Sequence, residues 1–192
     1  MRNRGRMKYE DWVELGAEGL RQSGPAPFTV DNLCARAGRT KGSFYHHFEG
    51  IQVFTMAVVR HWIEHETDIV ARAALKDEAP LEKLRAMWRL TAATDHRLEL
   101  GIRAMALTDG AIATLVADTD KRREAIMTGL LGAAYALDEE RASNFARLFH
   151  ALHLSAQMRA PEDIAGFSRG SVRTLVELLE REEKTRKPRA RT

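Results

Sequence analysis

Apolar residues recur every three or four positions along most of the chain, and no stretch alternates apolar and polar residues as a half-buried strand does. This spacing places the apolar residues on one face of an α-helix, and glycine, proline and capping residues divide the pattern into segments of helical length. We therefore expect an all-α fold of about nine helices. The predicted helices cover approximately residues 8–22, 29–37, 41–48, 51–75, 80–94, 98–107, 111–136, 138–159 and 162–184.

Particular residues mark the predicted helix ends. Gly38 can adopt the left-handed conformation that often ends a helix, and Pro80 suits a first helical turn. Asp138 is a good N-cap, and Pro161 cannot continue the helix that precedes it. The last helix begins later, near Ser168, if the glycines on either side of this serine interrupt it.

Composition restricts the class of protein. The 192 residues suit one domain or two small ones, and 44% hydrophobic residues are enough to build a core. No run of about 18 apolar residues occurs, so we expect no membrane-spanning helix. The single cysteine, Cys34, cannot form an internal disulfide, and the basic start MRNRGRMKYE lacks the apolar stretch of a secretory signal. We expect a soluble protein of the cytoplasm.

Charge is unevenly distributed along the chain. Residues 1–60 contain nine Lys or Arg and six acidic residues. Residues 61–183 contain 16 Lys or Arg and 21 acidic residues. Residues 184–192 contain five Lys or Arg and no acidic residue, and we expect 185–192 to form a disordered basic tail. Basic ends favour an anionic partner such as nucleic acid, although two solvated tails would give the same pattern.

Two short predicted helices joined by Gly38 have the shape of a DNA-reading helix-turn-helix. Cys34 is small enough for the two helices to approach each other closely. Phe44 and Phe48 lie four residues apart, so they share the face of the second helix that packs on a core. The remaining surface of that helix consists of Lys41, Gly42, Ser43, Tyr45, His46 and His47.

These residues suit a DNA surface. Lys41 can reach guanine edges or phosphate, and Gly42 lets the backbone approach the bases. Hydroxyl and imidazole groups can hydrogen-bond phosphate oxygens, and Thr29 stands where a helix N-terminus favours a phosphate. The alternative is a helical hairpin inside a larger bundle, but a packed helix would not show so many polar groups beside one glycine.

The same stretch resembles the TetR family of transcriptional regulators. The resemblance is carried by PFTVDNLCARAGRTKGSFYHHFEGIQVF at 27–54, and most specifically by TKGSFYHHF at 40–48. Weaker similarity extends over residues 8–136. The resemblance implies a three-helix DNA-binding domain at 1–50, and a helical domain at 51–184 that forms a homodimer and binds a small-molecule effector. By default, the resemblance also implies a repressor that leaves DNA when its ligand binds.

The resemblance assigns individual residues to double-stranded DNA, with Lys41 and Gly42 facing the bases. The side chains that would face the DNA backbone or the groove edges are Thr29, Thr40, Ser43, Tyr45, His46 and His47. Arg39 departs from the family's usual apolar turn residue, and either adds a phosphate contact or marks a looser turn. Ile51 replaces a common lysine. These departures leave open a module of the same fold that has lost DNA binding and binds only a ligand or a protein.

A basic N-terminal arm could compensate for the missing lysine at position 51. The arm contains Arg2, Arg4, Arg6 and Lys8, which could reach into the minor groove. Deleting residues 1–6 should then weaken DNA binding and flatten its salt dependence.

A single reading helix contacts too few base pairs to find a genomic site, so we expect a homodimer on a palindromic operator. The predicted dimer interface consists of Phe145, Leu148, Leu152, Ser155, Val172, Leu175, Val176 and Leu179. The predicted ligand pocket is lined by Trp62, His65, Met87, Trp88, Met105, Met127, Tyr135 and His150. Both sets of residues also suit ordinary packing in the core of one chain.

One motif points to different chemistry. His61, Glu64 and His65 match H-x-x-E-H, which resembles the signature of the inverted zinc proteases, and the two histidines share a helix face. The third protein ligand that such a site needs is not evident, and this pattern arises easily by chance in a helix rich in His and Glu. We therefore expect no enzymatic activity, no metal and no cofactor.

Overall fold

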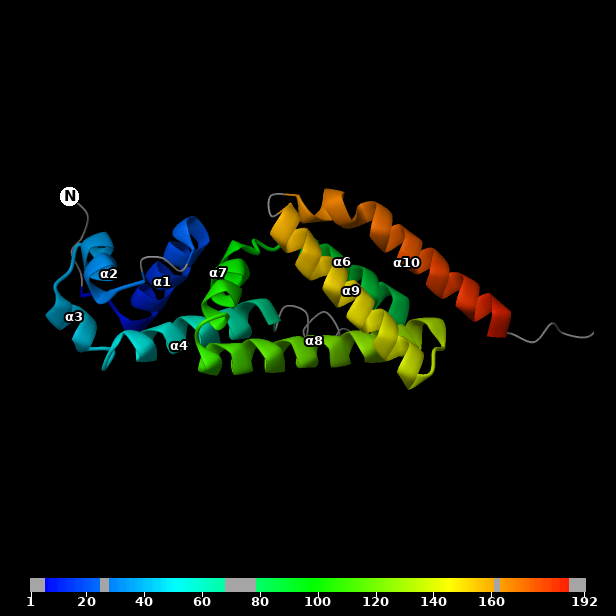
Figure 1. Ribbon diagram of the computed structural model, residues 1–192, viewed down its shortest axis with the longest axis horizontal. Coiled ribbons are helices and arrows are strands. Elements are labelled where there is room, and N and C mark those ends of the chain that lie inside the picture. Colours follow the sequence, from blue (N-terminus) through cyan, green and yellow to red (C-terminus); the bar gives the residue numbers. More distant parts are fainter. Residues whose placement is uncertain (1–5, 25–27, 68–78, 161–162, 187–192) are drawn as a thin grey trace, which may run out of the picture. The chain divides into compact units, whose positions relative to one another are not determined.

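The computed structural model describes residues 6–24, 28–67, 79–160 and 163–186. Over these ranges every regular element is helical, which confirms the expected all-α fold (Figure 1). The elements are α1 Tyr9–Ser23, α2 Val30–Ala37, α3 Lys41–Tyr45, α4 Ile51–Trp62, the π-helical turn η1 Ile63–Thr67, α6 Pro80–Ala93, α7 Arg97–Ala106, α8 Gly110–Tyr135, α9 Glu139–Arg159 and α10 Ile164–Arg186.

Capping residues fix several helix starts as predicted. The side-chain oxygen of Thr29 accepts a hydrogen bond from the backbone N–H of Asn32 at 3.3 Å. Asp138 accepts from the N–H of Arg141 at 3.0 Å, and Pro80 occupies the first turn of α6. These contacts satisfy donors that the first turn of a helix leaves free, which explains why the predicted starts agree with the structure.

Three predicted C-terminal helix ends differ from the structure by two residues or more. The second helix of the helix-turn-helix was predicted to reach residue 48, but α3 ends at Tyr45. Just beyond this end, the N–H of His47 donates to the carbonyl of Phe44, three residues earlier, at 2.9 Å. The helix predicted over 51–75 changes to η1 after Trp62, and its part beyond residue 67 lies outside the described residues. Helix α10 continues to Arg186, two residues into the tail predicted as disordered, and 187–192 lie outside the described residues.

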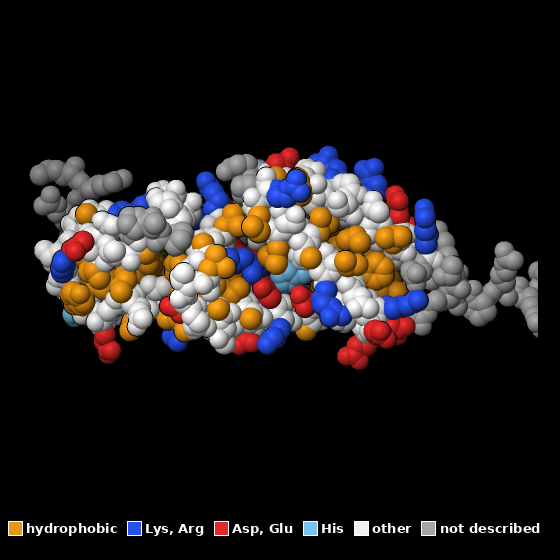
Figure 2. Space-filling view, viewed as in Figure 1, with side chains coloured by type: hydrophobic (Ala, Val, Ile, Leu, Met, Phe, Trp, Pro, Cys, Tyr) orange, Lys and Arg blue, Asp and Glu red, His pale blue; other side chains and the backbone are white. Residues whose placement is uncertain are grey.

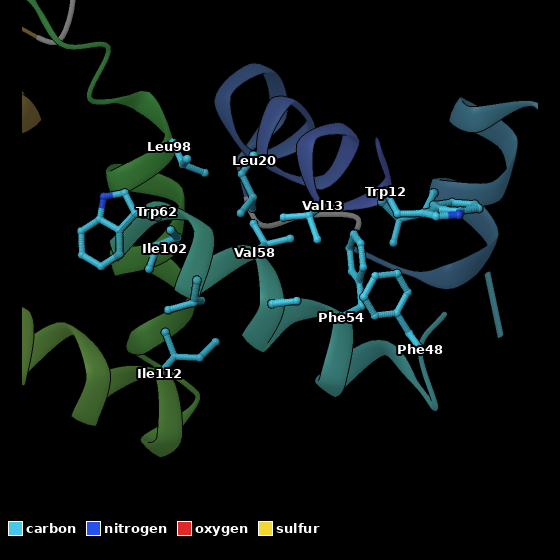
Figure 3. Packing of buried hydrophobic residues seen from close by; sticks show 14 of the residues in the cluster. Trp12, Val13, Leu20, Phe48, Phe54, Val58, Trp62, Leu98, Ile102 and Ile112 are labelled. Atoms are coloured by element: carbon cyan, nitrogen blue, oxygen red, sulfur yellow. The ribbon is translucent and has the colours of Figure 1, made fainter. Parts of the chain in front are cut away.

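The chain divides into two compact units, the first of which comprises Met1–His65 and His96–Ala117. Its core brings α1, α3, α4, α7 and the start of α8 together (Figure 3). Gly16 lets α1 approach α4 closely, since a Cβ at this position would lie 2.6 Å from the Cζ of Phe54. The fully buried residues include Trp12, Phe44, Phe54, Trp62 and Ile102.

The second unit comprises Glu66–Asp95 and Asp118–Thr192. Helix α9 packs against α10, and a separate core collects residues of α6, α8, α9 and α10. Leu84, Leu131 and Leu179 are fully buried in it. Among the described residues, no helix combines the length and the apolar character that crossing a membrane requires.

Candidate nucleic-acid interface

A left-handed glycine joins α2 to α3. Gly38 has φ 62° and ψ 39°, and its N–H donates to the carbonyl of Ala35 at 3.2 Å. The N–H of Arg39 donates to the carbonyl of Cys34 at 3.0 Å, so two backbone hydrogen bonds close the turn. The half-buried Arg39 therefore occupies a well-formed turn.

Aromatic packing fixes the orientation of α3. Phe44 is fully buried, with its ring 5.5 Å from that of Trp12 and 5.4 Å from that of Phe54 between centroids. Phe48 packs on the same side. Because this face is fixed against the core, the opposite face lies on the surface: Thr40, Lys41, Gly42, Tyr45 and His46 are exposed, and Ser43 and His47 are half-buried.

The lysine of this surface has a partner that the sequence did not suggest. The Nζ atom of Lys41 lies 2.6 Å from Oδ1 of Asp31, in the first turn of α2. Hydrogen bonding and charge attraction to Asp31 raise the pKa of Lys41 above its ordinary value. Burial and the same carboxylate raise the pKa of the Cys34 thiol, which makes this thiol a weak nucleophile.

Other predicted contact residues have structural roles. Thr40 accepts a hydrogen bond from the N–H of Ser43 at 3.3 Å, so it caps α3 as Thr29 caps α2. Ile51 is half-buried and packs against the core of the first unit. Its side chain contributes to packing at the position where the resemblance to the TetR family led us to expect a lysine.

The segment before α1 contacts the end of α3, which the sequence analysis missed. The Nε2 atom of His47 lies 3.0 Å from the carbonyl oxygen of Met7, and the guanidinium of Arg6 contacts Nε2 of His46. Asp11 accepts a hydrogen bond from the N–H of Lys8 at 2.8 Å. Residues 6–8 therefore have defined contacts beside the end of α3. Arg2 and Arg4 lie outside the described residues.

The H-x-x-E-H residues form a contact between helices. Nε2 of His61 lies 3.3 Å from Oε2 of Glu14 on α1, the rings of His61 and His65 stack with centroids 4.1 Å apart, and Glu64 is exposed. Burial and His65 lower the pKa of His61, and outweigh the opposite effect of Glu14. Within the part of the chain that the structure describes, no three His, Cys, Asp or Glu side chains are arranged to hold a metal ion.

The predicted pocket residues fall into two groups. Trp62 is buried in the core of the first unit, Met105 is half-buried and packs against that core, and His65 is exposed. Met87 and Tyr135 are buried in the core of the second unit, and the half-buried Trp88 and Met127 pack against it. His150 lies between two carboxylates of α8, with Nε2 3.4 Å from Asp120 and Nδ1 3.6 Å from Glu124.

The predicted dimer residues lie on α9 and α10, where Figure 2 shows apolar side chains gathered at the surface. Leu148 on α9 is 52% exposed, and Leu178, which lies on the apolar face of α10 that was expected to join the interface, is 44% exposed. Leu179 is fully buried within its own unit, so a second copy could not reach it. The half-buried members are Phe145, Leu152, Ser155, Val172, Leu175 and Val176.

No model of a protein family matches the sequence, and no curated protein matches it. Solved structures do match. A transcriptional regulator from Pseudomonas aeruginosa PAO1 has a TM-score of 0.70 at 17% identity, over 94% of this chain and 93% of its own. A TetR/AcrR family member has a TM-score of 0.72 at 17% identity, over 87% of this chain and 97% of its own.

A third match is SmeT, the repressor of the Stenotrophomonas maltophilia multidrug efflux pump SmeDEF. Its TM-score is 0.62 at 20% identity, over 92% of this chain and 88% of SmeT. The similarity in each case spans nearly the whole of both chains. The chain therefore has the fold of TetR/AcrR-type transcriptional regulators.

Proposed function

We propose that this protein is a TetR-like transcriptional regulator that binds double-stranded DNA through α2, α3 and the turn between them. The observation that carries the proposal is the orientation of α3: Phe44 is buried against Trp12, while Lys41, Gly42 and Tyr45 are exposed on the opposite face. A helix anchored in this way can enter the major groove with its polar side toward base edges.

The contacts on DNA divide into two kinds. Lys41 and Gly42 face bases, while Ser43, Tyr45 and the turn residue Arg39 face phosphates. The backbone N–H groups at the start of α2, which Thr29 caps, favour a nearby phosphate as well. In this assignment residues 1–50 carry DNA binding, and the protein acts in the cytoplasm, where its DNA is.

The protein binds DNA as a homodimer. Helices α9 and α10 expose leucine side chains that one chain leaves uncovered, and two copies of this helix pair would bury them in a four-helix bundle. A two-fold symmetric dimer reads two copies of one half-site, so the operator is palindromic.

Ligand binding within residues 51–184 regulates the dimer. A small molecule that favours one spacing of the two reading helices shifts the population on or off the operator. The protein is a repressor that ligand releases, in keeping with the repressor SmeT, which shares its fold. No catalytic step is part of this function.

Selection from random DNA duplexes tests the proposal. We expect a palindrome to be enriched, and Lys41→Ala to weaken binding to it by about tenfold, the scale of one good base contact. Lys121→Ala, which removes an exposed lysine of α8, is the matched control and should bind like wild type. Enrichment of no sequence, or a Lys41→Ala variant that binds as tightly as wild type, would refute DNA reading by α3.

A further inference from the structure

Two adjacent histidines at the end of α3 contact the segment that precedes α1. Nε2 of His47 lies 3.0 Å from the carbonyl oxygen of Met7, and Nε2 of His46 contacts the guanidinium of Arg6. The partners are 40 positions apart in the chain, so these contacts join the N-terminal arm to the reading helix.

The donors and acceptors of these contacts define the state of each ring. A guanidinium can only donate, so Nε2 of His46 accepts and carries no proton. A backbone carbonyl can only accept, so Nε2–H of His47 donates to Met7. The two neighbouring rings thus use the same atom in opposite roles, and each role suits the partner that it meets.

Neighbouring contacts support a fixed path for this segment. The N–H of Lys8 donates to Asp11, which fixes the start of α1. The ring of Tyr9 lies 4.9 Å from that of Phe48, between centroids, and Met7 packs against the core. The backbone from residue 7 to residue 9 is therefore held on the same side of the core as the end of α3.

We propose that His46 and His47 are positioning residues that seat Arg6 beside the reading face, so that its guanidinium meets DNA in a defined register. The inference rests on the proposed function and changes one part of it: the two imidazoles act through the arm, whereas the sequence assigned them to direct DNA contacts. Seating Arg6 before binding reduces the entropy lost when the arm is ordered on DNA. The arm would meet a phosphate or the minor-groove edge.

A double-mutant cycle between positions 46 and 6 tests this assignment on the selected operator. The variants are His46→Ala, Arg6→Met and the double variant in the full chain. If His46 acts through Arg6, His46→Ala weakens binding roughly two- to tenfold in the wild-type background and has little further effect once Arg6 is Met. If the His46 variant loses the same affinity in both backgrounds, the ring contacts DNA directly and the proposal is wrong.

Conservative variants separate positioning from folding. A glutamine at position 46 offers an amide oxygen that can accept from Arg6, and a glutamine at position 47 offers an amide N–H that can donate to Met7. His46→Gln and His47→Gln should therefore restore most of the affinity that the alanine variants lose. Alanine and glutamine variants that bind equally weakly, with thermal unfolding like that of wild type, would overturn the proposal.

The same experiments distinguish failure of the proposed DNA binding from failure of the positioning role. If wild type enriches no operator, the proposed DNA binding is wrong, and the positioning role that rests on it is wrong as well. If wild type enriches a palindrome that depends on Lys41, and the effects at positions 46 and 6 are merely additive, only the positioning role fails.

Discussion

The Nζ atom of Lys41 lies 2.6 Å from Oδ1 of Asp31, so the lysine at the start of the reading helix is paired with a carboxylate of the preceding helix. Both side chains are largely exposed. If α3 binds DNA as proposed, the DNA must compete with Asp31 for this ammonium group, and the carboxylate repels phosphate at the same place. The pair would then weaken binding to any duplex, and only a site with good base contacts would overcome it.

Replacing Asp31 with Asn should tighten binding to random duplex DNA by about two- to fivefold at low salt, because an exposed ion pair of modest strength is removed. Binding to the operator should tighten less, so the ratio of specific to non-specific affinity falls. Fluorescence anisotropy with operator and scrambled duplexes at several salt concentrations measures both. The control makes the Asp31→Asn substitution in a Lys41→Met variant, where there is no lysine to release, so the increase in affinity should be smaller than in wild type. An equally large increase there would show that Asp31 does not compete with DNA for Lys41.

The close contact between α1 and α4 predicts that a single methyl group added at Gly16 lowers the free energy of unfolding substantially. Gly16→Ala places a Cβ 2.6 Å from Phe54 and 2.9 Å from Val58, and should reduce the free energy of unfolding by about 1–3 kcal/mol. Gly19→Ala, in the same helix, meets no atom within 4 Å and should raise stability by up to about 1 kcal/mol. Urea unfolding of both variants measures the difference, and equal effects would exclude a tight crossing at Gly16.

Acid should weaken the fold through His61. Its pKa in the folded protein lies below the ordinary value of 6.5, so the unfolded chain takes up the proton first as the pH falls. The free energy of unfolding is therefore unaffected by this group above about pH 7, decreases below about pH 6.5, and levels off once the folded protein is protonated. Urea unfolding between pH 8 and pH 5 should show a smaller decrease for His61→Gln than for wild type. Parallel curves would rule out this contribution.

A charge on the α9–α10 surface should break the dimer. Leu148→Glu and Leu178→Glu place a carboxylate on exposed leucines that the proposed four-helix bundle buries, and desolvating that charge is costly. Sedimentation at micromolar concentration should find these variants monomeric and wild type dimeric. Leu107→Glu, which changes an 86% exposed leucine at the end of α7, should stay dimeric. A monomeric wild type would refute the proposed dimer, and dimeric variants at both positions would place its interface elsewhere.

Local signals accounted for most helix starts and for the reading unit. Thr29, Thr40 and Asp138 hydrogen-bond the N–H groups that a capping residue satisfies, and Gly38 has the left-handed conformation that the sequence required. The exposed face of α3 followed from the four-residue spacing of Phe44 and Phe48. In these cases the determinant and its effect lie within a few residues of each other.

Contacts between distant segments were not predictable in this way. Gly101 on α7 lies so close to α1 that an added Cβ would stand 3.2 Å from Leu20, a relationship that no periodicity encodes. The pairing of Lys41 with Asp31 and the contact of Met7 with His47 likewise depend on how helices and arm come together. The predicted pocket list collected large adaptable side chains, and such residues are equally suited to a core.

The main-chain closure of the turn between α2 and α3 has an evolutionary consequence. Gly38 and two backbone hydrogen bonds hold the turn, and neither depends on the identity of the side chain at position 39. A substitution at position 39 can therefore leave the backbone hydrogen bonds of the turn in place. If α3 binds DNA as proposed, duplicated genes of this kind could diverge in how tightly their products hold any duplex, through substitutions at that one codon.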